Sequence, residues 1–143
     1  MSMKVQVVCY SRSGGTKKVA DRIAREVGAE VQRPGDVSTI DGDIVFLGSG
    51  MYAGSFHNSV IKLVERCGLE GKVVAPFATH AAIPYEFKDV RHAVEKAGGT
   101  YLDGFLCFGQ FLFFINRGRP NESDLEDAAR FAREAIEHVA DDQ

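Results

Sequence analysis

Strand-like and helix-like segments alternate along almost the whole chain, and this alternation restricts its fold more than any other feature. Mostly apolar runs predict strands over residues 4–10, 43–47, 72–78 and 100–109, and residues 30–33 predict a short additional strand. Apolar residues at helical spacing predict helices over residues 16–27, 58–67, 87–97 and 123–139, the last opened by the capping-box pair Ser123 and Glu126. This order predicts a parallel sheet with helices on both faces and right-handed crossovers. We therefore expect a three-layer, doubly wound α/β fold.

Composition indicates a single globular domain over residues 1–143. The chain is 45% hydrophobic and 26% charged, and its net charge of -3 gives no support to nucleic-acid binding. No apolar run approaches the ~20 residues that span a bilayer, and residues 1–4 lead straight into the first strand, so we expect neither a membrane helix nor a secretory leader. The three cysteines form no metal or disulfide pattern, which favours a reducing cytoplasm.

The turn between the first strand and the first helix is the strongest functional signal. Five of the six residues in Ser11–Thr16 are Ser, Thr or Gly, and helical spacing begins at once. A helix N-terminus carries unpaired N–H groups and about half a positive charge, so it holds an anion well. Small residues let the backbone approach a phosphate, and hydroxyls add hydrogen bonds. We interpret the segment as a phosphate-binding turn; an ordinary βα turn without a ligand is the alternative.

The spacing excludes two common phosphate motifs. The turn lacks the first Gly and the Gly-Lys-Ser/Thr ending of a P-loop, and Gly14-Gly15 offers no G-x-G-x-x-G dinucleotide fingerprint. The run from Tyr10 to Ala20 instead resembles the FMN-phosphate signature of the flavodoxins, with an aromatic residue ending the strand, Thr16 opening the helix and Ala20 packing beneath it. Arg12 is a departure, because many flavodoxins bind the phosphate without a charged side chain.

The resemblance to flavodoxins covers nearly all of the chain and implies a five-stranded sheet of order 2-1-3-4-5. Ligands of such sheets bind beyond the carboxyl ends of the strands, where the strand order reverses. Residues 11–16, 48–56 and 79–85 would converge there, and the resemblance implies that the second and third stretches clamp a flavin ring. The implied FMN-binding residues are Ser11, Arg12, Ser13, Gly14, Gly15 and Thr16 at the phosphate, Gly50, Met51, Tyr52, Ala53 and Gly54 on the dimethylbenzene and N5 side, and Thr79, His80, Ala81 and Ala82 on the pyrimidine side.

Two roles in the second stretch are implied by the same resemblance. In the family a backbone carbonyl of this loop can turn to accept the N5 proton of the reduced flavin, and Gly50 and Gly54 are both candidates for that peptide. Tyr52 is the candidate for stacking on the ring, with a surface or core aromatic as the alternative.

The stretches beside the ring differ from those of electron-carrier flavodoxins, which are acidic. Residues 48–57 and residues 79–85, the latter ending at Tyr85, contain no Asp or Glu. Each stretch contains one histidine, His57 in the first and His80 in the second. With fewer negative charges beside the ring, a reduced anionic flavin is repelled less strongly. We therefore predict a higher reduction potential than in the carrier flavodoxins.

Residues 50–60 are also similar to the corresponding segment of the flavodoxin-type protoporphyrinogen oxidases, which have a Tyr-x-Gly-x-Phe-His stretch there. This chain departs from those enzymes by lacking a long basic and aromatic insertion. His57 is a candidate proton donor, since His titrates near neutral pH, but a polar residue opening the second helix is the favoured interpretation.

Residues 105–115 contain five phenylalanines. A buried last strand explains the first half, whereas residues 111–115 extend past a typical strand. They are candidates for an apolar patch that faces a substrate, a partner or a second subunit in a homodimer. Cys9 and Cys107 end strands and are interpreted as core residues.

Two functions from different classes follow from these patterns. The favoured one is an FMN-binding redox protein that passes electrons to a partner protein or to a small, quinone-type acceptor, either as a shuttle or as an oxidoreductase. The alternative is a flavin-free binding module of the same fold, because fold does not determine function. The hydroxyls and glycines gathered at one edge favour the first.

Overall fold

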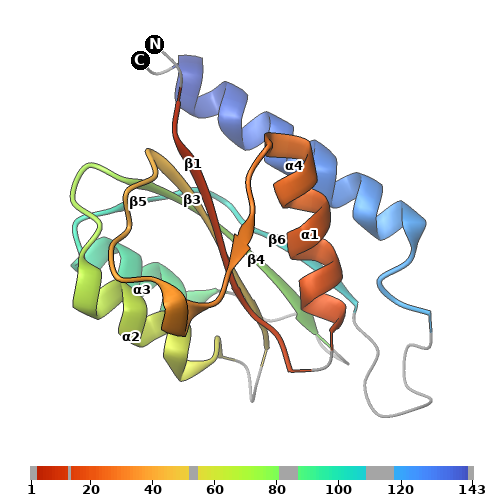
Figure 1. Cartoon of the computed structure of the whole chain (residues 1–143), viewed down its shortest axis with the longest axis horizontal. Coiled ribbons are helices and arrows are strands. Elements are labelled where there is room, and N and C mark those ends of the chain that lie inside the picture. Colours follow the sequence, from red (N-terminus) through yellow and green to blue (C-terminus); the bar gives the residue numbers. More distant parts are fainter. Residues whose placement is uncertain (1–2, 13, 52–54, 81–86, 109–117, 142–143) are drawn as a thin grey trace.

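The computed structural model describes residues 3–12, 14–51, 55–80, 87–108 and 118–141. A parallel sheet lies between two layers of helices (Figure 1). Its strand order, β2-β1-β3-β4-β5, confirms the predicted doubly wound topology. The strands are β1 (Val5–Tyr10), β2 (Val31–Gln32), β3 (Ile44–Gly50), β4 (Val73–His80), β5 (Thr100–Tyr101) and β6 (Phe105–Phe108); the helices are α1 (Gly15–Val27), α2 (Asn58–Cys67), α3 (Lys88–Lys96) and α4 (Glu122–Asp141), with a 3-10 turn η1 (Pro34–Asp36).

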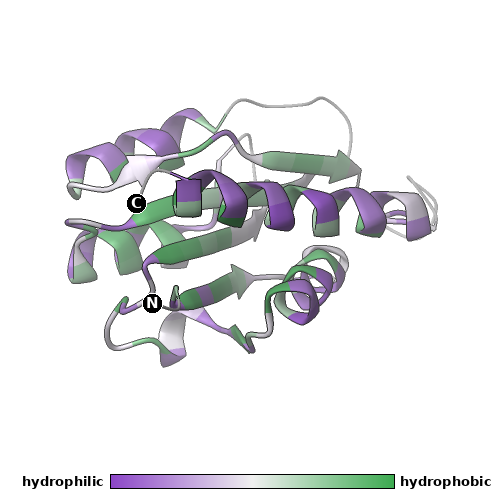
Figure 2. Cartoon of the chain, turned by 90° about the horizontal axis from the view of Figure 1, so that it is seen from above, coloured by the Kyte–Doolittle hydropathy of each residue, from purple (hydrophilic) through white to green (hydrophobic). Residues whose placement is uncertain are grey.

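The sheet separates two hydrophobic clusters. Side chains alternate along the central strands, so that Val7 and Phe46 face α1 and α4, whereas Val8 and Leu47 face α2 and α3. All four side chains are fully buried, and burying a side chain of this size stabilises the fold by about 1.5–3 kcal/mol. Seen from above, hydrophobic strands lie between helices whose outer surfaces are hydrophilic (Figure 2). None of the helices in the described ranges combines the length and the hydropathy of a membrane span.

The predicted last strand is wrong in one respect, because it is divided into β5 and β6, which both pair with β4. The N–H of Leu102 donates to the carbonyl of Val74 (2.9 Å). Every second residue of β4, counted from Val74, therefore points its backbone N–H and carbonyl toward β5 and β6. Pro76 is the next of these residues and has no N–H, so the ladder breaks opposite it. Gly104 fills the break: a Cβ there would lie 2.8 Å from the carbonyl oxygen of Pro76.

Two central strands extend further than predicted. β3 continues through Gly50 and β4 through His80, and Gly50 pairs with Thr79. Residues 48–50 and 79–80 therefore belong to the sheet and not to the loops that follow it. Glycine has a low intrinsic strand propensity, but β3 has a pairing partner on each side, and this pairing outweighs the propensity.

The predicted cap of the last helix is also wrong. The reciprocal hydrogen bonds join Asn121 and Asp124, since the N–H of Asp124 donates to Oδ1 of Asn121 (3.0 Å) and the N–H of Asn121 donates to Oδ2 of Asp124 (2.8 Å). This is the geometry of a capping box two residues before the Ser123 and Glu126 pair. Arg119 stabilises the earlier position by binding the same carboxylate at 2.6 and 2.8 Å.

Candidate functional site

The crevice predicted to hold a ligand lies at the carboxyl ends of β1 and β3. The chain leaves β1 through α1 toward the edge strand β2, whereas it leaves β3 through α2 toward β4 on the other side. The strand order therefore reverses between β1 and β3, and open α/β sheets bind ligands at such a point. The predicted phosphate turn, residues 11–16, follows β1 into this crevice.

An oxygen atom already lies against the backbone amides of the phosphate turn. The hydroxyl Oγ of Ser11 accepts hydrogen bonds from the N–H of Gly14 (3.1 Å) and the N–H of Lys17 (3.3 Å). Gly14 is the N-cap of α1 with a φ of 89°, a conformation that L side chains rarely adopt. The first turn of α1 contains no acidic residue. The turn therefore presents N–H donors and the positive end of a helix dipole to an oxygen ligand.

Thr16 and Thr79 meet beneath the phosphate turn. Their side-chain oxygens are 2.7 Å apart in a hydrogen bond, and the residues are only 3% and 7% exposed. The hydroxyl of Thr16 therefore points toward the sheet and not toward the predicted phosphate. Only the backbone of Thr16 lies at the N-terminal end of α1. Thr79 likewise directs its hydroxyl toward α1.

The two stretches predicted to clamp a ring are bonded to each other where they leave the sheet. The N–H of Met51 donates to the carbonyl of Thr79 (2.9 Å). The hydroxyl of Ser49 donates to the carbonyl of Gly50 (2.6 Å) and accepts from the N–H of His57 (3.0 Å). The peptide that joins Gly50 to Met51 is therefore held at both its carbonyl and its N–H.

His57 caps α2 and stacks on the residue that ends β1. Its Nδ1 accepts from the N–H of Ser59 (3.2 Å) and lies 2.9 Å from the hydroxyl oxygen of the same residue. The ring lies over that of Tyr10, with centroids 3.6 Å apart and planes 9° apart. This geometry agrees with the favoured interpretation of His57 as a polar residue that opens the second helix.

Asp89 makes a contact with residues 48–57 that the sequence did not reveal. It lies in the first turn of α3, and its Oδ2 accepts from the N–H of Phe56 (3.0 Å). The ring of Phe56 also meets that of Phe87 edge to face, with centroids 5.6 Å apart. The other carboxylate oxygen, Oδ1, is buried and has no hydrogen-bond partner among the described residues. The fold thus brings a carboxylate to a stretch that contains none of its own.

The remaining predicted residues are placed as follows. Arg12 is exposed, Gly15 is the first residue of α1, and Gly50 is buried at the end of β3. His80 is the last residue of β4. Ser13, Tyr52, Ala53, Gly54, Ala81, Ala82 and the phenylalanine-rich residues 111–115 lie outside the described residues, so their roles stay predictions.

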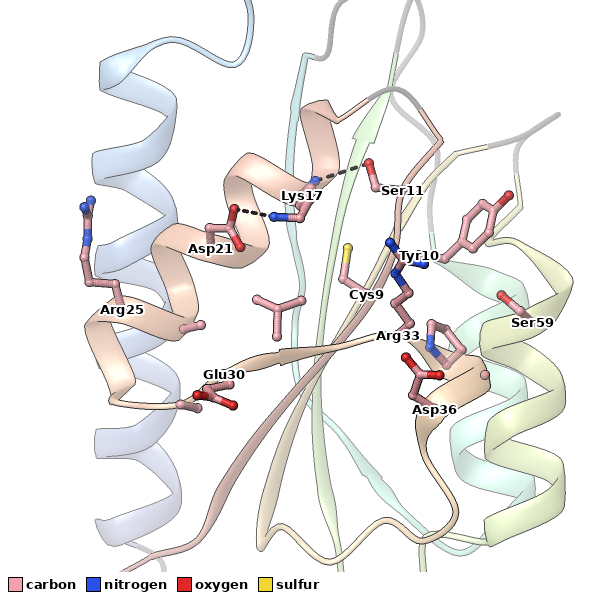
Figure 3. A pocket seen from close by; sticks show the side chains of 15 residues that line it. Cys9, Tyr10, Ser11, Lys17, Asp21, Arg25, Glu30, Arg33, Asp36 and Ser59 are labelled. Atoms are coloured by element: carbon pink, nitrogen blue, oxygen red, sulfur yellow. Dashed lines mark hydrogen bonds and ion pairs between the residues drawn. The ribbon is translucent and has the colours of Figure 1, made fainter.

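A groove of about 840 Å³ adjoins the phosphate turn on the side of β2 (Figure 3). On this side β2 has only two residues, and Pro34, which has no N–H with which to continue the ladder along β1, follows soon after. The wall of the groove contains side chains of both positive and negative charge. They include Arg33 and the ion pair of Lys17 with Asp21 (3.0 Å). The volume suits a small molecule. Of the residues that line the groove, none belongs to the described part of the stretches predicted to clamp a ring, so the groove borders the end of the crevice at which the sequence predicts the phosphate.

The buried thiols are core residues, as predicted. Cys9 is 5% exposed and Cys107 7% exposed. The pKa of each thiol is raised to about 12, mainly by burial and to a smaller extent by a nearby carboxylate, Asp21 for Cys9 and Asp124 for Cys107. Neither thiol is therefore a nucleophile near neutral pH. The described residues contain no cluster of side chains suited to a metal ion.

Comparison with known proteins identifies the family. The model of the family described as "Flavodoxin domain" matches residues 6–113. An uncharacterized protein of Methanocaldococcus jannaschii is 30% identical over 137 residues, which cover 86% of this chain and 91% of that protein.

Solved structures share the fold over most of this chain. A flavodoxin from the domain Archaea superposes with a TM-score of 0.73 at 20% identity, covering 96% of this chain and 99% of its own. Flavodoxin 1 from Bacillus cereus gives 0.71 at 19% identity over 94% and 98%. The rubredoxin oxygen:oxidoreductase of Desulfovibrio gigas gives 0.72 at 14% identity, and the match covers 91% of this chain but 34% of that one. The chain belongs to the flavodoxin domain family.

Proposed function

We propose that this protein binds FMN non-covalently and transfers electrons to a redox partner protein or a small acceptor. The observation that carries the proposal is the Ser11 oxygen held by the N–H groups of Gly14 and Lys17 at the start of α1. These are the donors that a phosphate oxygen uses at a helix N-terminus. Membership of the flavodoxin domain family and the likeness to solved flavodoxins support the same assignment.

In this proposal the protein supplies binding and orientation. A bound flavin would supply the electron-transfer chemistry. The turn at residues 11–16 would hold the phosphate, and residues 50–54 and 79–82 would hold the ring. Because the peptide between Gly50 and Met51 is held at both its carbonyl and its N–H, the carbonyl of Gly50 is the less suitable candidate for turning toward N5. Of the two glycine candidates, this favours Gly54.

The structure adds no weight to porphyrinogen oxidation as the specific activity. Two residues of the stretch that resembles the oxidases have structural roles here. Phe56 is a core residue with 3% exposure, and His57 caps α2. A general electron-transfer role therefore accounts for these residues as well as an oxidase role does.

The first experiment is a visible absorbance spectrum of the protein after FMN is added and the mixture is passed through a desalting column. Flavin absorbance that stays with the protein supports the proposal. Anaerobic stepwise reduction then separates the two modes of transfer. Accumulation of one-electron reduced flavin indicates a shuttle, and direct two-electron reduction indicates an oxidoreductase. Loss of all FMN on the column would favour the flavin-free binding module.

A matched pair of variants tests whether the phosphate turn is responsible. Gly14 and Gly28 flank α1, both have positive φ (89° and 74°), and a Cβ at either would meet no atom within 4 Å. Gly14→Ala and Gly28→Ala should therefore destabilise the fold similarly, by about 1–2 kcal/mol. Only Gly14→Ala should weaken FMN binding, by about tenfold, which corresponds to about 1.4 kcal/mol. Equal FMN affinities of the two variants would place the phosphate elsewhere.

A further inference from the structure

We propose that the groove beside the phosphate turn is a binding site for the adenylate half of FAD, so that this protein binds FAD more tightly than FMN. Because the flavin phosphate is taken to lie in the turn at residues 11–16, the proposal rests on the proposed function and deepens it. The groove would add a second subsite, which is filled by the part of FAD that FMN lacks.

The groove is continuous with the phosphate turn. Ser11, whose Oγ accepts from the N–H groups of Gly14 and Lys17, lines the groove, and so does Lys17 itself (Figure 3). A phosphate held at the turn would therefore also lie beside the groove. None of the described residues predicted to hold the flavin ring lines it, so FMN bound as proposed would not occupy it. Its volume of about 840 Å³ falls within the range of about 300–1,000 Å³ that is usual for small-molecule sites.

Arg33 supplies a cation for the second phosphate of FAD. It directly follows β2, is exposed and lines the groove, and its side chain extends from the end of β2 toward Ser11 in Figure 3. No ion pair within the described residues involves Arg33. Its guanidinium therefore offers a planar set of N–H donors that matches phosphate oxygens. The turn has no G-x-G-x-x-G with which to hold two phosphates by its backbone, so we assign the second phosphate to this side chain.

Asp36 supplies an acceptor for the hydroxyls of the adenosine ribose. It lines the groove in the same 3-10 turn that Arg33 precedes, and in the part of the chain that the structure describes its carboxylate pairs neither with Arg33 nor with another cation. Dinucleotide-binding α/β folds bind these hydroxyls with an acidic residue about 20 residues after the phosphate turn. Asp36 lies at this spacing from Thr16. The carboxylate is therefore both available and suitably placed for a ribose.

The wall of the groove along α1 offers apolar surface for a purine ring. Ala24 lies in α1, and Ala29 and Val31 follow this helix; all three line the groove and belong to or pack against one hydrophobic cluster. A purine has apolar faces and polar edges, so a site of apolar surface with a few polar groups suits it. FAD exceeds FMN by a phosphate, a ribose and a purine, and the groove presents a matching group for each of them.

Equilibrium dialysis of the protein against FMN and against FAD, with the bound flavin measured by its visible absorbance, gives the two dissociation constants. FAD should bind about tenfold more tightly than FMN. The phosphate monoester of FMN and the diphosphate of FAD carry a similar charge near neutral pH, so the difference would report contacts of the adenylate half and not overall charge attraction. Equal or weaker binding of FAD would overturn the proposal.

Arg33→Ala and a control variant locate the contacts. Arg33 is exposed, and its side chain makes no cap hydrogen bond to the 3-10 turn, so the fold should tolerate the change. Arg33→Ala should weaken FAD binding by about tenfold and leave FMN binding within about twofold of the wild type. Lys96→Ala removes a cation from the last turn of α3, outside the groove, and should change neither affinity. An equal loss of FMN and FAD affinity in Arg33→Ala would overturn the adenylate subsite.

Failure of this inference is distinct from failure of the proposed function. A protein that binds FMN but binds FAD no more tightly would leave the proposed function intact and refute the adenylate subsite. A protein that binds neither flavin would overturn both.

Discussion

At Gly48 the central strand β3 passes directly under the ring of Phe77. A Cβ at this position would lie 2.1 Å from two carbons of that ring, which is itself fully buried. We expect Gly48→Ala to lower the free energy of unfolding by about 1–3 kcal/mol, because an over-packed core must shift to accept the methyl group. Urea denaturation measures the difference. Gly35→Ala is the control, since a Cβ at Gly35 meets no atom within 4 Å, and equal effects at the two positions would contradict the packing argument.

The hydrogen bond between Thr16 and Thr79 can be tested by a double-mutant cycle. Thr16→Val leaves the hydroxyl of Thr79 buried without its partner, which should cost about 1–3 kcal/mol of unfolding free energy. The double variant Thr16→Val with Thr79→Val removes both polar groups and should cost less than the sum of the single changes. Strict additivity in the denaturation curves would show that the two hydroxyls do not interact.

Contacts of this kind explain why the sequence indicates local features of the candidate site but not the contacts between its separate segments. Small residues and hydroxyls in residues 11–16 are a local signal, so the turn could be identified before its structure was known. The partners of Thr16 and of Phe56 lie 63 and 33 residues away, at Thr79 and Asp89. No local pattern connects such positions. The sequence also could not indicate that the hydroxyl of Thr16 turns inward.

At the scale of elements, the start of α4 should give the fold a measurable acid sensitivity. Hydrogen bonding to Arg119 lowers the pKa of Asp124 below its usual 3.8, and the Asn121 N–H acts in the same direction. A group whose pKa is lower in the folded state stabilises the fold above its unfolded pKa and loses that contribution as the pH falls through its folded pKa. Asp124→Asn should therefore destabilise the protein by about 1–2 kcal/mol at neutral pH, and the difference should shrink below about pH 4.

Urea denaturation at a series of pH values measures this dependence. Asp127→Asn is the control on the same helix, because Asp127 is 51% exposed and forms only a 3.6 Å pair with Arg130. A stability difference between Asp124→Asn and the wild type that does not change with pH would refute the assignment to the carboxylate.

Helices were predicted more closely than strand ends, and the reason is physical. The apolar periodicity of a helix lies entirely within its own segment, so the predicted range of α2 coincides with the observed one and that of α3 differs by one residue at each end. The limits of a strand depend on its neighbours. Pro76 lies in the neighbouring strand β4, and the predicted last strand is divided opposite it into β5 and β6. The strands that pair with β3 likewise extend β3 through Gly50. Arg119 likewise decides which capping pair opens α4.

For the whole molecule, the burial of the thiols predicts a simple labelling pattern. Cys9 and Cys107 are buried and have a pKa of about 12, whereas Cys67 is partly exposed near the surface. Iodoacetamide at neutral pH should therefore modify Cys67 in the native protein and all three cysteines in denaturant. Mass spectrometry counts the labels. Rapid modification of Cys9 or Cys107 under native conditions would mean that the hydrophobic cluster between the sheet and the helices α1 and α4, to which both thiols belong, opens readily.

Both edges of the sheet are short in the described ranges. β2 has two residues on one side, and the other side is divided into β5, with two residues, and β6, with four. The breaks arise next to Pro34 and Pro76, which lack the N–H group that a longer ladder would need. Within the residues that the structure describes, neither edge offers a long row of open peptide groups onto which a strand of another molecule could add. In this part of the chain, the two prolines therefore also limit the length over which a foreign strand could pair with either edge.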